Sequence, residues 1–344
     1  MDNTPFIKKT VFGSKAERAL YNALNTKWDN KFHIFPSLPF ANLVNFEGVN
    51  LKEKEREFLF KTSIDFTLCD KATDKPILSI DFDGMGYGFS RNGEYIEISP
   101  SSDYYRKLKF DLKLKIARQA HYNYFIVSYK ETENLDPTLH LTIVDGIIGE
   151  ILADNRTRDI LQERGKELND ILSDEPNPSI RNEVISDFVV EAEVEADFEW
   201  NPFVKKKAEL EEEMRKNGIF CISSEFRPLT EYSLPVRLDL PTHNFASRMK
   251  TLELPTWVGW EVTVEWTKIK EQGAIIGEKW NKDEGLTVTF KRQNENVAES
   301  RKFETTKVKK SVLIRNHDLF SASLSADMAE LLAYNEVHKR AFSL

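Results

Sequence analysis

The sequence predicts an α/β protein in which a mixed β-sheet flanked by helices is followed by a second, β-rich α+β domain. Three observations support this fold class. In the first half of the chain, helix-length segments alternate with short apolar runs of strand length. Two later segments alternate strictly between apolar and polar residues, as half-exposed antiparallel strands do. The length of 344 residues also favours two domains over one.

Two helices and one edge strand are expected at the start of the chain. Residues 14–28 are expected to form a helix, because Ser14 and Glu17 have the spacing of a capping box and apolar residues follow at helical intervals. Residues 35–40 contain two prolines, which are tolerated mainly in irregular or edge strands. Residues 51–60 form a charged segment that we expect to be helical.

Two apolar runs at residues 63–68 and 77–83 have strand length, and the turn-like residues 70–76 join them. We interpret them as neighbouring strands. The further elements expected here are a glycine-rich loop, a helix, a buried strand, a second strand and a long helical stretch, at residues 84–100, 103–120, 122–129, 139–144 and 147–171.

The acidic, proline-containing residues 174–178 are typical of a surface linker. They predict an N-terminal domain of residues 1–174 and a C-terminal domain of residues 185–344. Two alternating strands and a final amphipathic helix are expected in the C-terminal domain, at residues 260–266, 286–291 and 325–340.

The composition is that of a soluble globular protein, with 40% hydrophobic and 30% charged residues. No apolar run of about 18 residues occurs, so we expect no membrane span, and the first residues lack the apolar core of a signal peptide. The two cysteines, Cys69 and Cys221, lie far apart within apolar runs, which excludes a disulfide framework or a zinc cluster. We therefore expect buried thiols in a cytoplasmic protein.

The net charge of −8 sets no preference for nucleic acid and does not exclude it, because binding depends on local basic patches. Acidic residues concentrate at residues 183–213, whereas basic residues cluster at 106–115 and 307–310. The cluster from Lys307 to Lys310 is either a solvated face or a nucleic-acid contact. The histidines show no metal-ligand spacing, and no nucleophile elbow of a serine hydrolase is present.

The two neighbouring strands carry three aspartates, Asp65, Asp81 and Asp83, in an otherwise buried pattern. An unpaired buried carboxylate is costly, and a hard divalent cation is the simplest partner that offsets this cost. Asp81 and Asp83 are two residues apart, so a strand directs both side chains to the same face. Asp65 reaches the same place if the strands form a hairpin. Alternatively, Asp65 and Asp81 are strand-end residues bonded to backbone amides.

A helical wheel of residues 106–120 places Lys107 and Lys115 on the solvent side, and Lys109 and Lys113 on the apolar side. An ammonium group on the inward face of a helix requires a partner. The aspartates of the adjoining strands are the expected partners, unless the two lysines extend past the core to water.

In their order along the chain, these residues resemble the PD-(D/E)XK nuclease superfamily, and most closely its very-short-patch-repair-like branch. The matching features are the helical Glu17, Asp65 on the second core strand, the segment Asp81-Phe82-Asp83-Gly84, a lysine-bearing helix and an apolar strand. The resemblance covers residues 10–150 and implies a restriction-endonuclease-like sheet flanked by helices.

The chain departs from the superfamily's pattern in three places. Asp83 stands where a lysine usually follows the second acid, so the resemblance implies that Lys113 or Lys109 of the next helix replaces that lysine. The second acid is Asp81, where this branch often has Glu, and the His often found after Asp-Gly is absent. Glu17 is a plain capping-box partner in the alternative interpretation.

The resemblance implies a metal-dependent endonuclease that hydrolyses phosphodiester bonds. We favour DNA as the substrate, and the sequence does not decide between DNA and RNA. Asp65, Asp81 and Asp83 would hold Mg²⁺ or Mn²⁺ through oxygen ligands, and the ion would activate water. Lys113, or Lys109 in its place, would stabilise the developing negative charge.

Two alternatives stand beside this interpretation. One is a non-catalytic nucleic-acid-binding or interaction protein on a decayed nuclease fold. The other is an enzyme whose acids serve a different metal reaction. The expected partner is nucleic acid, first of all DNA, and protein partners are expected, if any, through the C-terminal domain.

Overall fold

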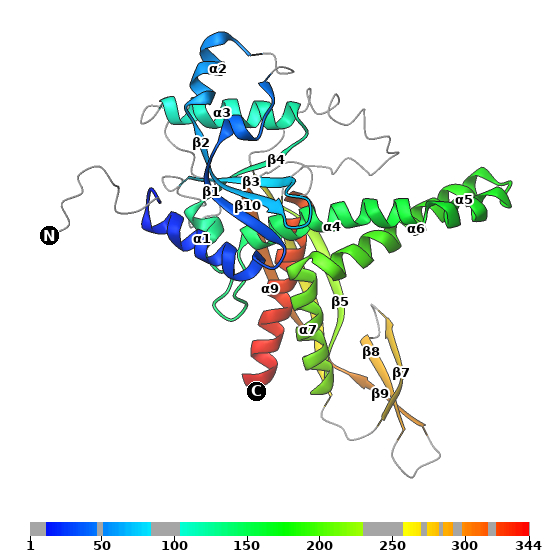
Figure 1. Cartoon of the computed structure of the whole chain (residues 1–344). Coiled ribbons are helices and arrows are strands. Elements are labelled where there is room, and N and C mark those ends of the chain that lie inside the picture. Colours follow the sequence, from blue (N-terminus) through cyan, green and yellow to red (C-terminus); the bar gives the residue numbers. More distant parts are fainter. Residues whose placement is uncertain are drawn as a thin grey trace. The chain divides into compact units, whose positions relative to one another are not determined.

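The computed structural model describes residues 12–46, 51–83, 104–229, 257–269, 274–281, 285–291, 298–315 and 321–343. The chain forms two compact units, Met1–Glu133 and Asn134–Leu344. Figure 1 shows both, with most of their helices and strands labelled. No helix in the described ranges is long and apolar enough to cross a membrane. Cys69 is buried and Cys221 half-buried, and both are free thiols.

The first unit is a four-stranded mixed sheet with helices. Its main elements are α1 (Lys15–Trp28), β1 (Phe32–Pro39), α2 (Glu53–Phe60), β2 (Ser63–Asp70), β3 (Pro76–Asp83), α3 (Tyr104–Gln119) and β4 (Asn123–Ser128). The sheet order is β1-β2-β3-β4. The first three strands pair antiparallel, and β4 pairs parallel to β3 after the helical crossover through α3. The mixed sheet and the hairpin predicted from the sequence are therefore confirmed.

Local sequence signals set the beginning of this unit. The Ser14 hydroxyl accepts a hydrogen bond from the Glu17 N–H (3.0 Å), and the Glu17 carboxylate accepts one from the Ser14 N–H (3.2 Å). This capping box starts α1 as predicted. Among the described strands, the proline-containing β1 pairs with β2 alone and is an edge strand, also as predicted.

An apolar core joins α3 to the sheet. Phe110, Leu112 and Ile116 of α3 pack in one cluster with Tyr124 and Ile126 of β4. The apolar side of α3 therefore packs on the sheet that carries the aspartates. The lysines on this side of α3, Lys109 and Lys113, are brought to the same sheet face.

The second unit combines helices with two antiparallel sheets. Its helices are α4 (Ile143–Glu163), α5 (Gly165–Ser173), α6 (Pro178–Trp200), α7 (Pro202–Lys216) and α9 (Ser321–Ser343). Its strands are β5 (Ile219–Pro228), β6 (Trp257–Lys268), β7 (Ala274–Asn281), β8 (Gly285–Lys291), β9 (Ala298–Phe303) and β10 (Thr306–Arg315). One sheet has the order β10-β6-β5 and the other β7-β8-β9, and α9 packs on β6 and β10.

The strand expected at residues 139–144 is absent from the structure, so this prediction is wrong. Thr142 accepts a hydrogen bond from the Asp145 N–H (3.2 Å), and the Asp145 carboxylate accepts one from the Thr142 N–H (2.8 Å). This capping box begins α4 at Ile143. Only an isolated bridge between Asn134 and Thr142 precedes it. Local capping outweighs the β-branched composition that favoured a strand.

The two compact units meet between Glu133 and Asn134, whereas the sequence predicts a domain boundary near residue 174. Residues 174–177 form a turn between α5 and α6, and the Asn177 side chain caps α6. α4 belongs to the second unit, because a Cβ atom added at Gly146 would lie 2.5 Å from Phe203 of α7 and Leu324 of α9. The glycine-rich segment 84–100 lies outside the described residues.

Two carboxylates of the second unit share one donor. The Asn201 amide group donates hydrogen bonds to Glu150 Oε1 of α4 (2.9 Å) and to Asp327 Oδ2 of α9 (2.8 Å). Burial, reinforced by the nearby Asp197, raises the pKa of Asp327 to about 7. Burial and the facing Asp327 also raise the pKa of Glu150. One proton is therefore retained by this pair to higher pH than in an unfolded chain.

We expect the stability of the second unit to fall as the pH rises through 7. The pKa of Asp327 in the folded protein lies above its ordinary value of 3.8. The stabilisation that the bound proton contributes is therefore fully present below about pH 4, and it is lost as the pH rises through the folded pKa of about 7. The variant Asp327→Asn should flatten the pH dependence of the unfolding free energy by on the order of 2 kcal/mol. Urea titrations at a series of pH values measure this, with the exposed Asp159→Asn as the control. An unchanged slope in Asp327→Asn would contradict the expectation.

A fragment of residues 1–133 should fold and unfold cooperatively, because it contains a complete sheet and its core. A fragment of residues 1–174 should self-associate, because Ile147, Ile148 and Ile151 of α4 lose the helices that bury them. Circular dichroism and sedimentation velocity distinguish the two cases. If the 1–174 fragment is monomeric and the 1–133 fragment aggregates, the domain boundary lies near residue 174, as predicted from the sequence.

Candidate active site

The hairpin of β2 and β3 brings Asp65 and Asp81 together. Its backbone register ends at the pair Phe66 and Ile80, so the next two residues face each other. At this point, hydrogen bonds from backbone N–H groups to the two carboxylates take the place of backbone–backbone hydrogen bonds between the strands. The Asp65 N–H donates to Asp81 Oδ1 (3.0 Å), and the Phe82 N–H donates to Asp65 Oδ2 (2.7 Å). The predicted meeting of these two acids is confirmed, and so is their bonding to backbone amides.

Lys113 forms a buried ion pair with Asp81. Its Nζ donates to Asp81 Oδ2 at 2.5 Å and to the Ser63 carbonyl at 2.6 Å. Both side chains are 0% exposed. Burial lowers the pKa of Lys113, and the facing Asp81 carboxylate opposes that shift. The inward lysine of α3 therefore has an acidic partner on the neighbouring strand, as predicted from the helical wheel.

Tyr124 is a member of this cluster that the sequence analysis missed. Its hydroxyl donates to the same Asp81 Oδ2 that Lys113 contacts. Farther along the strands, Thr67, Ser79 and Tyr122 form a second hydroxyl chain, with O···O distances of 3.0 and 2.8 Å. The available signal was the spacing of two residues between Tyr122 and Tyr124, which directs both hydroxyl groups to one face of a buried strand.

The electrostatic environment of Asp65 differs from that of an exposed carboxylate. Burial, and next the charge of Asp81, raise the pKa of Asp65 to about 6, although the Phe82 N–H and the Lys109 charge oppose the shift. Glu17 adds a smaller effect in the same direction as Asp81. The closeness of the Asp65 and Asp81 carboxylates favours a bound cation.

Glu17 and Lys109 lie at the margin of this cluster. The Glu17 carboxylate accepts the backbone N–H groups of Gly13 (2.7 Å) and Ser14, as a capping residue does. Lys109 is half-buried, and its Nζ lies 5.6 Å from the ring centre of Phe110. Both residues act on Asp65 through their charge rather than through a hydrogen bond to it. Of the two inward lysines, Lys113 is the one that contacts the acids.

The donor set suits Mg²⁺ or Mn²⁺ in chemistry, because Asp65 and Asp81 supply carboxylate oxygens at one place. Among the described side chains, no group of three or more His, Cys, Asp or Glu residues is arranged to hold a metal ion. The third predicted ligand, Asp83, pairs through its backbone with Ser128 of β4. Its side chain lies outside the described part of the structure.

The basic cluster Lys307–Lys310 is extensively ion-paired within its own unit. Lys309 lies 2.8 Å from Glu261, and Lys310 lies 3.0 Å from Glu336. Lys307 is 3.7 Å from Glu265. These pairs favour the solvated-face interpretation, because a phosphate backbone would have to compete with carboxylates already in place.

We expect Lys113→Met to lower the unfolding free energy by about 3–5 kcal/mol at pH 7, because Asp81 is left buried without its counter-ion. Lys115→Met, at an exposed position of the same helix, should stay within about 0.5 kcal/mol of the native protein. Adding Asp81→Asn to Lys113→Met should restore part of the loss. Urea unfolding followed by circular dichroism measures all three, and equal stability of the two lysine variants would refute a buried pair.

Comparisons of the chain with family models, with curated proteins and with solved structures find no match. The function is therefore inferred from the residues of the site themselves.

Proposed function

We propose that this protein is a Mg²⁺- or Mn²⁺-dependent endonuclease that hydrolyses phosphodiester bonds, with DNA as its preferred substrate. The observation that carries the proposal is the cluster of Asp65, Asp81 and Lys113 on one sheet face. Stability alone does not account for it, because apolar residues in place of a buried ion pair are often equally stabilising. Two carboxylates beside an ammonium group are the components of metal-assisted phosphoryl chemistry.

The order of elements around the cluster also supports the proposal. A helix with Glu17, a hairpin with Asp65 and Asp81, a helix with Lys113 and an apolar parallel strand follow one another in the first unit. This is the order that the resemblance to the PD-(D/E)XK superfamily implies. The lysine comes from the helix after the acidic strand, in the place proposed for this branch.

Each side chain of the cluster would have a defined task. Asp65 and Asp81 would hold the divalent ion, which supplies Lewis-acid stabilisation of the phosphate and a reactive water when bound. The Lys113 ammonium has three donors, of which two are directed to Asp81 and the Ser63 carbonyl. The Lys113 side chain is 0% exposed, so its third donor would reach a phosphate oxygen only where substrate binding opens this side of the cluster. Tyr124 would hold the Asp81 carboxylate in position through its hydroxyl group.

One observation favours the second candidate, a non-catalytic nucleic-acid-binding or interaction protein on the same fold. Both oxygens of Asp81 already accept hydrogen bonds from the protein, and the side chain is 0% exposed. In this alternative, the buried ion pair is a structural remnant that fixes α3 against the hairpin.

Cleavage assays with plasmid and single-stranded DNA in Mg²⁺, Mn²⁺ or EDTA test the proposal. We expect cleavage that EDTA abolishes, and a loss of about 100-fold or more in Asp65→Asn and Asp81→Asn, since both remove an ionic oxygen ligand. Asp74→Asn is the matched control, because this exposed aspartate lies in the turn of the same hairpin. Calorimetric titration with Mn²⁺ reports metal binding separately.

The outcomes distinguish the candidates. Metal binding without cleavage of any nucleic acid would indicate a different metal reaction, and DNA binding without metal or cleavage would indicate the non-catalytic protein. Single-turnover rates of folded Lys113→Met and Lys109→Met identify the active lysine. Loss of the preorganised donor should raise the barrier by about 2–4 kcal/mol in only one of them.

A further inference from the structure

A row of large apolar side chains lies exposed on α6. Val190, Val194 and Phe198 are 52%, 50% and 54% exposed. They are four residues apart, so they share one face of the helix. The same face continues toward the start of α6 through Asp187, Glu183 and the 42%-exposed Ile180, and we call these six residues the outer row.

The opposite face of α6 is already packed. Ala192 and Ala196 are fully buried against Ala153 and Ile160 of α4. Figure 1 shows α4, α5 and α6 as an extended helical arm of the second unit. Two of the three buried residues of α6 are therefore alanines, whereas Val190, Val194 and Phe198 face solvent. A surface helix ordinarily directs most of its large apolar side chains to the core. Such a surface indicates a docking face.

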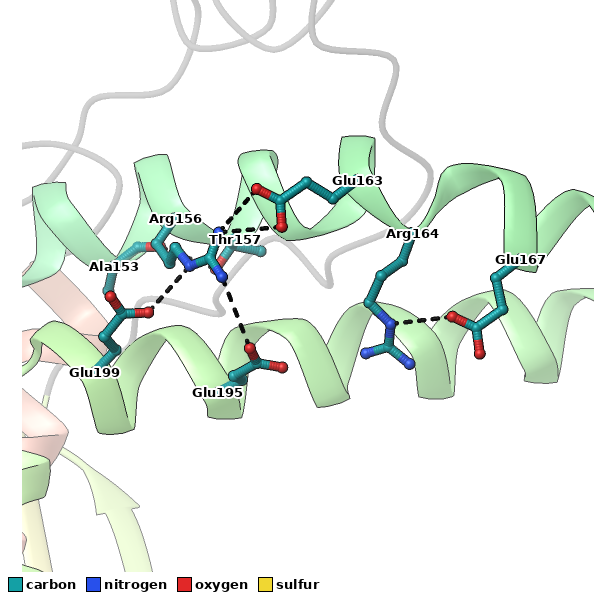
Figure 2. Close-up of polar contacts among 8 residues, drawn as sticks. All are labelled: Ala153, Arg156, Thr157, Glu163, Arg164, Glu167, Glu195 and Glu199. Atoms are coloured by element: carbon teal, nitrogen blue, oxygen red, sulfur yellow. Dashed lines mark hydrogen bonds and ion pairs between the residues drawn. The ribbon is translucent and has the colours of Figure 1, made fainter.

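Several carboxylates of α4 and α6 share two arginines within the arm. Figure 2 shows the Arg156 guanidinium group beside Glu163, Glu195 and Glu199, with N–O distances of 3.2, 3.9 and 3.0 Å. Arg164 likewise lies 3.6 Å from Glu191. No basic side chain of the described residues pairs with Glu183 or Asp187, which are exposed in the outer row. The outer row therefore presents apolar groups together with uncompensated negative charge.

We propose that the outer row of α6 docks a basic amphipathic helix of another protein. Apolar anchors four residues apart fit a helix laid alongside, and flanking carboxylates select lysines and arginines on its margins. A second copy of α6 does not meet this requirement, because α6 carries seven carboxylates and a single basic residue, Arg181. The phosphates of nucleic acids and anionic lipids are repelled for the same reason. This surface is independent of the proposed nuclease activity.

Binding of a synthetic leucine–lysine helix to the full chain tests the proposal. The probe has about 20 residues, with leucines on one face and lysines on the other, and its partner peptide has the same composition in scrambled order. Fluorescence anisotropy should give at least about tenfold tighter binding of the amphipathic probe, and Val194→Asp and Phe198→Ser should each weaken it about tenfold. Glu183→Gln combined with Asp187→Asn should weaken it and reduce its salt dependence.

The matched control is Phe60→Ser, because Phe60 is 55% exposed on α2, outside the outer row. It should leave the affinity unchanged, and thermal melting of every variant shows that the fold is intact. Equal binding of both peptides, or no loss in folded Val194→Asp and Phe198→Ser, would overturn the proposal. So would a dimer in sedimentation equilibrium that Val194→Asp converts to a monomer, since a second copy would then occupy the row.

Discussion

The ion pair between Asp81 and Lys113 is the interaction on which the first unit depends. Asp81 belongs to β3, and its oxygens receive donors from β2, from α3 and from β4. The pair thereby joins three strands and the crossover helix at one point of the sheet. Because neither charge can reach water, any shift of α3 against the hairpin would leave a buried charge unpaired. The same ion pair thus fixes both the geometry of the candidate site and the position of α3 on the sheet.

The secondary structure of the first unit could be predicted because its signals are local. The capping box at Ser14, the proline-punctuated edge strand and the turn between the two acidic strands each act within a few residues. The inward position of Lys113 followed from helical periodicity, and the hairpin then placed Asp65 beside Asp81. Helical periodicity shows which side chains of α3 face inward, but not which side chains of neighbouring strands contact Asp81. The hydrogen bond from the Tyr124 hydroxyl therefore could not be predicted in this way.

The division of the chain into two compact units depends on which distant segments pack together, and local sequence signals do not report this. Proline and acidic residues at 174–178 have the same composition in a linker as in a helix–helix turn. What distinguishes the two is the contact of α4 with α7 and α9, which involves Gly146 and residues far along the chain. The predicted strand at residues 139–144 fails for a local reason instead, because the capping box of Thr142 and Asp145 starts α4 at Ile143.

The edge of the four-stranded sheet has a consequence for the behaviour of the protein in a crowded solution. Pro36 and Pro39 of β1 have no N–H group to offer, and Ser37 between them has a positive φ of 54°. An incoming strand would find neither a complete row of donors nor a regular pleat to extend. The exposed strand β1 is thereby a poor template for intermolecular β-pairing, which protects the sheet from polymerising through this edge.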